Sequence, residues 1–345
     1  MQSLFVRQIT RRYPFKADKT PWIARVYCYP LERWSLARAA LFGAPNFLLF
    51  LLVQRFSPIR PKGRFFYSIG GQKKPIRFNG LNTQFHAVYG KFFSGGYEPQ
   101  TTALLDLLCP ADGIFYDIGS NWGWFSLYLA SKPGFQGKIH AFEPFPPSYA
   151  DISSVVEQAG LTGQITCHNV ALSDQAGEAF MHLPDHFQSG MATLKAGKSA
   201  GDQRTRVATL DSLNLAPPSL VKMDVEGNEI KALRGGAQTI TRHQPMMVFE
   251  NKRSSGNPME TLEPLFFLRD AGYQFFHVCW LKQTGKTSYL LGDDADPNPQ
   301  DQETLALVPM EVEDRFLRYD GMNILACHKD KISQIKQLFQ ERTLP

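Results

Sequence analysis

A glycine-rich turn flanked by two acidic side chains is the part of this sequence best suited to chemistry. The apolar run Ile114 to Ile118 predicts a buried β-strand, and Gly119 and Gly123 after it allow a tight turn and a close approach of backbone to a ligand. Glu143 lies 24 residues beyond Gly119, at the end of a second predicted strand. An acidic side chain at that place suits hydrogen bonds to two ribose hydroxyls. The spacing therefore predicts a nucleoside cofactor site.

The chemistry of the turn indicates which cofactor. Dinucleotide sites use G-x-G-x-x-G to bring backbone N–H groups against a negatively charged pyrophosphate. Here the turn reads Asp117-Ile-Gly-Ser-Asn-Trp-Gly123, and its carboxylate would repel such an anion. A ligand that carries an amino group and a sulfonium fits better, so we expect S-adenosyl-L-methionine. A nicotinamide-dependent oxidoreductase becomes a weaker alternative.

Six motifs, taken in order, resemble the FkbM family of S-adenosylmethionine-dependent methyltransferases over about residues 85 to 250. They are Tyr97-Glu-Pro99, Asp117 to Gly123, Ala141-Phe-Glu-Pro144, Asn169 to Asp174, Thr209-Leu-Asp211 and Lys222-Met-Asp-Val-Glu-Gly-Asn-Glu229. The resemblance implies a class I methyltransferase fold and O-methylation of a sugar or another hydroxylated natural product. Ser120 and Trp122 depart from the small residues usual in the family's turn, which narrows the space beside the cofactor.

The resemblance also implies a set of cofactor contacts. Glu98 would meet the methionine amino group, although an ordinary first-turn acid favoured by the helix dipole is an equal alternative. Aliphatic residues within Asn169 to Asp174 would hold the adenine ring, with Asp174 or nearby backbone bonding its exocyclic amine. The expected cofactor-binding residues are Glu98, Asp117, Gly119, Ser120, Asn121, Gly123, Glu143, Pro144, Ala171, Asp174 and Asp224.

Methyl transfer from a sulfonium is an in-line displacement, so the enzyme has to align a hydroxyl and accept its proton. Asp224, at the end of a predicted strand, is the first choice of base, and Glu250 and His182 are further catalytic candidates. Asp224, Glu250 and Asn251 are similar to the set that holds magnesium in catechol O-methyltransferases, and Mg²⁺ would lower the pKa of the substrate hydroxyl. A metal-free alternative stays open, in which Asp224 orients the cofactor and Glu250 contacts the substrate.

The histidines near residue 184 need a separate interpretation. His182 and His186 have the i, i+4 spacing of a helical metal pair, but Pro184 between them breaks a helix. We therefore expect them in a hairpin insertion between Gly177 and Arg206 that overhangs the crevice.

From residue 114 the chain alternates strand and helix, which predicts an α/β fold. We expect a Rossmann-like, three-layer sandwich with a mostly parallel, seven-stranded sheet. Ligands in such sheets bind beyond the carboxyl ends of the strands, so Asp117, Glu143, Asp224 and Glu250 should converge on one crevice. The expected strands are 114–118, 138–143, 164–170, 220–224, 244–250, 273–280 and 322–327, with a hairpin over 73–85 and a polar loop or lid over 282–320.

Three segments are expected: an extension over 1–65 with a helical part, a cap of hairpin and helix over 66–110, and a cofactor-binding methyltransferase domain over 111–345. Residues 1–60 carry ten Lys or Arg against Asp18 and Glu32, a charge of +8, which leaves 5 − 8 = −3 for the remainder of a chain of net charge +5. The 15 apolar-rich residues 39–53 are shorter than the about 20 that span a bilayer. A helix on an anionic membrane surface and a helix buried against the domain or a second subunit both remain open.

Composition narrows the classes of protein further. A chain of 345 residues with 43% hydrophobic residues can bury a full core. Its five cysteines are widely spaced without a C-x-x-C pair, so we expect reduced thiols in the cytoplasm, or on the inner face of the membrane if the extension binds lipid. The acidic balance after residue 60 disfavours a nucleic acid substrate. A small-molecule, glycan or glycolipid acceptor is expected, homo-oligomers remain open, and a non-catalytic nucleotide- or glycan-binding module is the rival interpretation.

Overall fold

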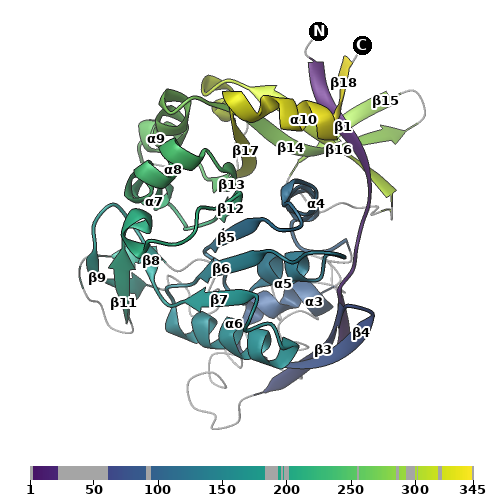
Figure 1. The fold of residues 1–345 in the computed structure, drawn as a ribbon, viewed down its shortest axis with the longest axis vertical. Helices are drawn as coiled ribbons and strands as arrows, with labels where there is room; N and C mark the ends of the chain where they lie inside the picture. Colours follow the sequence, from purple (N-terminus) through teal and green to yellow (C-terminus); the bar gives the residue numbers. More distant parts are fainter. Residues whose placement is uncertain are drawn as a thin grey trace, which may run out of the picture.

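The computed structural model describes residues 3–21, 61–90, 95–182, 193–195, 197, 202–254, 256–284, 287–292, 300, 302–317 and 321–343. Its centre is a large mixed sheet with helices on both faces (Figure 1). The expected apolar run 39–53, with the proposed membrane helix, lies outside the described residues, as does His186. Among the helices that are described, none combines the length and the apolar character needed to cross a membrane.

Seven strands form one part of the sheet, from its β7 edge inward, in the order β7-β6-β5-β12-β13-β17-β14. The first five run parallel, and β17 is antiparallel to both of its neighbours. The α/β class with a mostly parallel central sheet is therefore confirmed. These strands are β5 (Ile114–Ile118), β6 (Lys138–Phe142), β7 (Ile165–His168), β12 (Leu220–Met223), β13 (Met246–Asn251), β14 (Tyr273–Thr284) and β17 (Met322–His328).

The sheet is larger than the seven strands expected, because four more strands bring it to eleven. β16 (Gln302–Met310) pairs with β14, and β1 (Ser3–Thr10) pairs with β16 and with β18 (Gln340–Thr343). β15 (Thr287–Leu291) adds to β14. The expected polar loop over 282–320 thus contains two strands, and residues 3–10 form a strand that joins the two ends of the chain rather than a helix.

Two smaller sheets flank the large one. β2 (Phe15–Lys19), β3 (Lys62–Ile69) and β4 (Gln72–Asn79) form an antiparallel sheet, so strand pairing crosses the expected boundary at residue 65. The hairpin turns at Gly70 and Gly71, both with positive φ, so it covers 62–79 and not 73–85 as expected. β9 (Gly177–His182), β10 (Thr193–Lys195) and β11 (Gln203–Ala208) form the expected insertion, with β8 (Ala171–Leu172) at its edge.

Helices cover the two faces of the sheet in separate groups. α4 (Pro99–Leu108), α5 (Trp124–Ala130) and α6 (Pro146–Ala159) share one core with the β5 residue Phe115. α7 (Glu229–Gly235), α8 (Ala237–His243) and α9 (Pro258–Asp270) pack on the other face, with Tyr116 and Ile118. Successive residues of β5 thus serve opposite cores, as the two-residue period of a strand requires. The remaining helices are α3 (His86–Tyr89) and α10 (Ile332–Leu338).

Local sequence explains where several helices begin and end. Pro99, Pro146 and Pro258 each occupy the first turn, where a missing N–H costs nothing. The Asn257 side chain accepts a hydrogen bond from the Met259 N–H and caps α9. Gly160 ends α6 with a φ of 67°, a conformation that glycine adopts without strain. These signals fix the lengths of the helices that flank the candidate site.

Candidate active site

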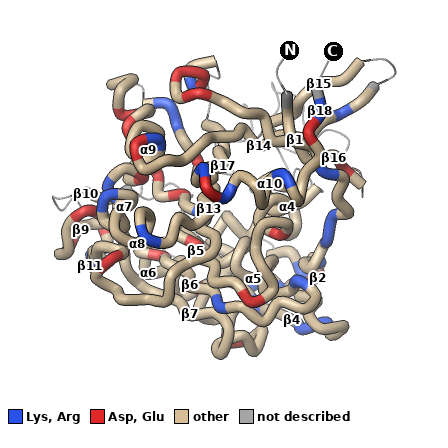
Figure 2. The backbone as a smooth tube through the Cα atoms, turned by 45° about the horizontal axis from the view of Figure 1, so that its top comes forward, with Lys and Arg blue, Asp and Glu red and all other residues tan. Residues whose placement is uncertain are grey.

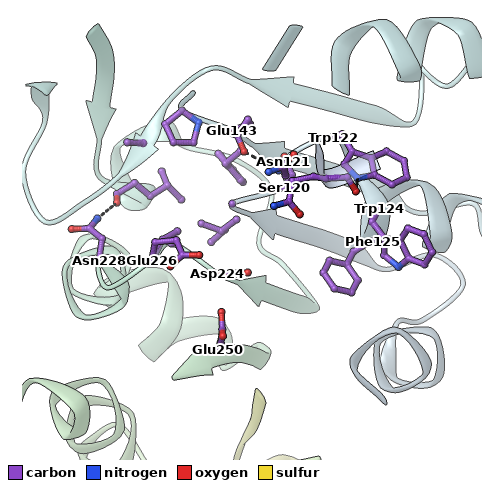
Figure 3. Close-up of a pocket in the computed structure, with 18 of the residues that line it drawn as sticks. Ser120, Asn121, Trp122, Trp124, Phe125, Glu143, Asp224, Glu226, Asn228 and Glu250 are labelled. Carbon is purple, nitrogen blue, oxygen red and sulfur yellow. Dashed lines mark hydrogen bonds between the residues drawn. The ribbon is translucent and has the colours of Figure 1, made fainter. Parts of the chain in front are cut away.

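A cavity of about 340 Å³ opens at the carboxyl ends of β5, β6, β12 and β13. Figure 3 shows its two chemical characters: the rings of Trp122, Trp124 and Phe125 gather at one end, and Asp224 and Glu250 lie on the side of β12 and β13. Of the expected cofactor residues, eight line it: Glu98, Gly119, Ser120, Asn121, Glu143, Pro144, Ala171 and Asp224. The structure therefore brings most of the predicted site together.

In the turn after β5, the backbone of Gly119 lies directly against the backbone at the end of β12. Gly119 has a φ of 81°, and a Cβ at this position would lie 1.8 Å from the carbonyl oxygen of Asp224 at the end of β12. The N–H groups of Gly119 and Ser120 both donate to the carbonyl of Phe142, at 2.9 and 3.1 Å. Only glycine fits such an approach without displacing a strand end. Gly123 does not line the cavity but lets α5 begin beside Ile152.

Glu143 connects the ends of β5 and β6. Its Oε2 accepts from the Asn121 N–H and its Oε1 accepts from the Phe145 N–H, both at 2.8 Å. Burial raises the pKa of this carboxyl to about 7, against the lowering effect of the two backbone donors. Each oxygen can accept a second hydrogen bond, so a pair of ligand hydroxyls could bind the same carboxylate.

The structure does not place the Asp117 side chain in the cavity. Asp117 is buried, and its Oδ2 accepts from the Ser126 N–H at 3.1 Å and from the Ser126 Oγ at 2.6 Å. It points to the α5 face because it lies an odd number of positions from Tyr116 and Ile118, which face the other core. Burial raises its pKa to about 6. The direct contact with the amino-acid tail of a cofactor that we expected is corrected to support of α5 behind the turn.

An aliphatic wall completes the cavity beyond Glu143. Val170, Ala171 and Leu172 line it, as predicted for a site that holds a flat ring. The Asn228 side chain, which the sequence did not single out, donates to the Leu172 carbonyl at 2.9 Å and also lines the cavity. Asp174 is exposed and lies outside the lining, so its expected bond to an adenine amine is not supported by its position.

Three carboxylates converge on the β12 and β13 side. Asp224, Glu226 and Glu250 have ligand oxygens that all lie within 4.8 Å of one another. Burial and the neighbouring Asp224 raise the pKa of Glu250 to about 8, and the same two causes raise that of Glu226. The Lys252 ammonium lies 2.6 Å from Glu226 and 3.4 Å from Glu250, and its positive charge offsets that of the carboxylates. The Oδ1 of Asp224 is buried without a hydrogen-bond partner among the described residues.

The prediction that Asn251 is a metal ligand is wrong. Its Oδ1 accepts from the Arg315 Nε at 2.5 Å, and its Nδ2 donates to the Thr261 carbonyl at 2.9 Å. Asn251 follows Glu250 in β13, so strand alternation turns it to the opposite face. The Lys252 ammonium already bonds two of the three clustered carboxylates. A divalent cation does not fit this donor set unless Lys252 moves away.

A buried lysine lies behind the acidic cluster. The Nζ of Lys222 is 3.9 Å from both Glu98 and Asp224, and 5.3 Å from the centre of the Phe125 ring. Although burial opposes it, these carboxylates raise the pKa of Lys222. Glu98 adopts a φ of 37° before α4 and accepts from the Asn323 side chain at 3.2 Å. Lys222 therefore places a positive charge behind two cavity carboxylates at the end of β12.

His182 is not positioned for catalysis at this cavity. Its Nδ1 lies 2.8 Å from the Oδ1 of Asp202, and its side chain is not part of the lining. The preceding residue, Met181, lines the cavity together with its strand partner Leu194. Alternation along β9 therefore turns His182 away, which corrects the prediction that made it a catalytic candidate.

Other lining residues were absent from the sequence prediction. Lys252 could have been found, because it lies two positions beyond Glu250, just after the end of β13, where the two-residue period continues the same face. Tyr97 and Asn228 lie within motifs of the resemblance but were given no role. Others carry no local signal; they include Gln84, Ala87, Met181 and Leu194.

Residues 114–275 match the family model described as the methyltransferase FkbM domain. The chain contains an FkbM methyltransferase domain. This domain holds the turn, Glu143, the aliphatic wall and the carboxylate cluster, while Gln84, Ala87, Tyr97 and Glu98 reach the cavity from outside it. The sequence resemblance is thereby confirmed.

Two curated relatives match part of the chain. Hexuronic acid methyltransferase AglP of Haloferax volcanii is 26% identical over 130 residues, which is 36% of this chain and 50% of the relative. Methyltransferase 1 of Beauveria bassiana is 30% identical over 151 residues, covering 36% of this chain and 59% of the relative. The chain thus spans between half and three fifths of the curated relatives that it matches. A solved methyltransferase FkbM from Methylobacillus flagellatus has 16% identity over 57% of this chain and 44% of its own, with a TM-score of 0.36.

Proposed function

We propose that this protein is an S-adenosylmethionine-dependent O-methyltransferase that acts on a hydroxyl of a saccharide, glycolipid or related natural product. The observation that carries the proposal is the cavity that joins Glu143 at the end of β6 to the carboxylates at the ends of β12 and β13. The FkbM domain match supports methyl transfer. A saccharide acceptor is supported by the name of the AglP relative, a hexuronic acid methyltransferase.

The cavity residues fit the cofactor by charge and by space. Ser120 Oγ and Asp224 Oδ1 belong to lining residues and are buried without hydrogen-bond partners in the described part of the chain, so each can bond a polar ligand. Glu143 would take the ribose hydroxyls, and Val170, Ala171 and Leu172 would hold the adenine. Glu98, Asp224 and Glu250 would face the positively charged amino and sulfonium groups. A pyrophosphate in this acidic setting would be repelled, which disfavours the nicotinamide alternative.

The cofactor supplies a methyl group on a sulfonium that an acceptor oxygen attacks. The acceptor hydroxyl would lose its proton as its oxygen takes the methyl group and S-adenosylhomocysteine leaves. Asp224, whose buried Oδ1 has no hydrogen-bond partner in the described part of the chain, would accept that proton. Glu250 is the second candidate base, because burial raises its pKa toward neutrality. Tyr97, Trp124 and Phe125 add aromatic surface to the same cavity.

Thermal unfolding with S-adenosylhomocysteine or NAD tests the proposal. A ligand at one hundred times its dissociation constant adds about 2.7 kcal/mol to the free energy of unfolding, enough to raise the Tm measurably. We expect S-adenosylhomocysteine to raise the Tm and NAD to leave it unchanged. Stabilisation by NAD alone would favour an oxidoreductase. Stabilisation by S-adenosylhomocysteine with no methyl transfer to any saccharide hydroxyl would favour the binding module.

A further inference from the structure

A second cavity, of about 210 Å³, lies beside the first. Both cavities are lined by Ala87, Tyr97 and Trp124, so these three residues form a shared wall. The second cavity is otherwise lined by residues from the segment between β1 and β2, from α3 and from the start of α4. Figure 2 shows Lys and Arg recurring along that first segment. A group bound here would lie next to the acidic cavity.

The two neighbouring cavities have opposite charge. The first is lined by five acidic residues, Glu98, Glu143, Asp224, Glu226 and Glu250, with Lys252 as its basic residue among those described. Among the described residues that line the second cavity none is acidic, and two are arginines, Arg11 and Arg12. A cationic ligand therefore suits the first cavity and an anionic ligand suits the second.

The guanidinium of Arg11 has hydrogen-bond donors that the described residues around it do not use. Its side chain is 4% exposed, and neither Nη1 nor Nη2 has a hydrogen-bond partner among the described residues. The nearest carboxylate, Glu303, is 3.8 Å away, and its own short bonds go to Lys282 Nζ at 2.6 Å and the Gln300 N–H at 2.8 Å. A buried guanidinium without hydrogen bonds is costly unless another group pairs with it.

Arg12 lines the same cavity, but its guanidinium is bound by other groups of the protein. It bonds both oxygens of Asp106 and also the Ser131 Oγ, and its guanidinium lies 4.4 Å from the centre of the Tyr128 ring. These contacts satisfy its charge within the fold. Arg11 has an ion pair with Glu303 and lies 5.6 and 5.8 Å from the ring centres of Tyr13 and Trp280, but its Nη donors make no hydrogen bond to a described residue and can therefore serve an anion.

We propose that the second cavity binds the methyl acceptor and that Arg11 selects an acceptor with a carboxylate or phosphate on a sugar ring. This inference rests on the proposed methyltransferase function. The aromatic residues of the cavity, among them Tyr13, Phe15, Tyr89 and Trp124, offer flat faces for the apolar side of a pyranose, and the guanidinium offers a forked donor for the anion. Because Ala87, Tyr97 and Trp124 border both cavities, an acceptor anchored at Arg11 would extend past them, and its hydroxyl would meet the cofactor and Asp224 in the acidic cavity.

Calorimetric titration of the full chain saturated with S-adenosylhomocysteine tests the inference directly. Matched probes are 4-nitrophenyl β-D-glucuronide against 4-nitrophenyl β-D-glucoside, and glucose 6-phosphate against glucose. We expect at least one anionic probe to bind about ten times more tightly than its neutral match, because a charged hydrogen-bonded pair is gained. The pair that shows the larger ratio distinguishes a carboxylate from a phosphate.

Arg11→Gln should abolish this preference while S-adenosylhomocysteine affinity stays within about threefold. Arg7→Gln is the matched control, because it removes the same charge from an exposed position of β1 and should leave the preference intact. If Arg11→Gln does not fold, the comparison of probes on the unaltered chain decides alone.

The possible failures separate the two proposals. Equal binding of anionic and neutral probes, or a preference that survives in Arg11→Gln, overturns the role of Arg11 while the proposed function stands. Failure of the unaltered chain to bind S-adenosylhomocysteine overturns the proposed function itself.

Discussion

The two sides of the acidic cavity differ in how their polar groups are satisfied. On the β5 and β6 side, Glu143 bonds two backbone N–H groups, and the turn N–H groups bond the Phe142 carbonyl. On the β12 and β13 side, Asp224, Glu226 and Glu250 crowd together and are offset by lysines. Hydrogen bonds to backbone groups hold the first side in place, whereas the second side gathers negatively charged side chains. We infer that the first side binds the ribose of the cofactor, and that the second faces its positively charged end and performs the chemistry.

Asp224→Asn should impair catalysis on the second side and leave cofactor binding on the first side largely intact. The amide has nearly the same shape but accepts no proton, so kcat should fall by about 10² to 10⁴. The affinity for S-adenosylhomocysteine, measured by calorimetry, should change by less than about tenfold. Asp174→Asn, the same change at an exposed position outside the cavity, is the control. An unchanged kcat would exclude Asp224 as the base.

Gly119→Ala tests the point where the two sides touch. The new Cβ would lie 1.8 Å from the Asp224 carbonyl at a φ of 81°, so the strand ends must separate. We expect the free energy of unfolding to fall by about 3 kcal/mol or more, from strain and overpacking together. Chemical denaturation measures this. Gly134→Ala has a similar φ of 78° with nothing within 4 Å, and it should cost only the backbone strain; equal losses in the two variants would contradict a close contact at Gly119.

The pH dependence of cofactor affinity should differ from that of kcat, and this difference between the two sides should be smaller than the effects of the two variants above. Burial raises the pKa of Glu143 to about 7, so cofactor affinity should weaken as pH falls through 7 and this carboxylate gains a proton. Burial and Asp224 raise the pKa of Glu250 to about 8, so kcat should rise as pH increases through 8 if the ionised form takes part. In Glu250→Gln the rise of kcat should flatten while the affinity profile is kept. Loss of the affinity profile in that variant would mean that the two sides are not independent.

The sequence was sufficient for the central strands because each carries a local signal. Apolar runs end in Asp, Glu or glycine at the places where β5, β6, β12 and β13 deliver residues to the cavity. The outer strands were missed for a physical reason. β1 is defined by pairing with β16, as in Phe5 with Leu307, and with β18, as in Ser3 with Thr343, and neither partner is visible in a local pattern.

The errors in the candidate site come from strand alternation. Asp117, His182 and Asn251 each lie on a strand, and each faces away from the cavity that a strand neighbour or near neighbour lines. The period of two was available from the sequence, but which of the two faces carries the cavity depends on tertiary packing. Gln84 and Ala87 show the other limit, because only the fold brings their segment to the cavity.

The affinity of two isosteric variants for S-adenosylhomocysteine, measured by calorimetry at pH 8, tests the central claim most directly. Glu143→Gln should weaken binding by about tenfold or more, because one acceptor of the ribose hydroxyls becomes a donor. Asp117→Asn should leave the affinity within about threefold while lowering the Tm, because its carboxylate supports Ser126 and α5. Unaltered affinity in a folded Glu143→Gln protein would contradict the account.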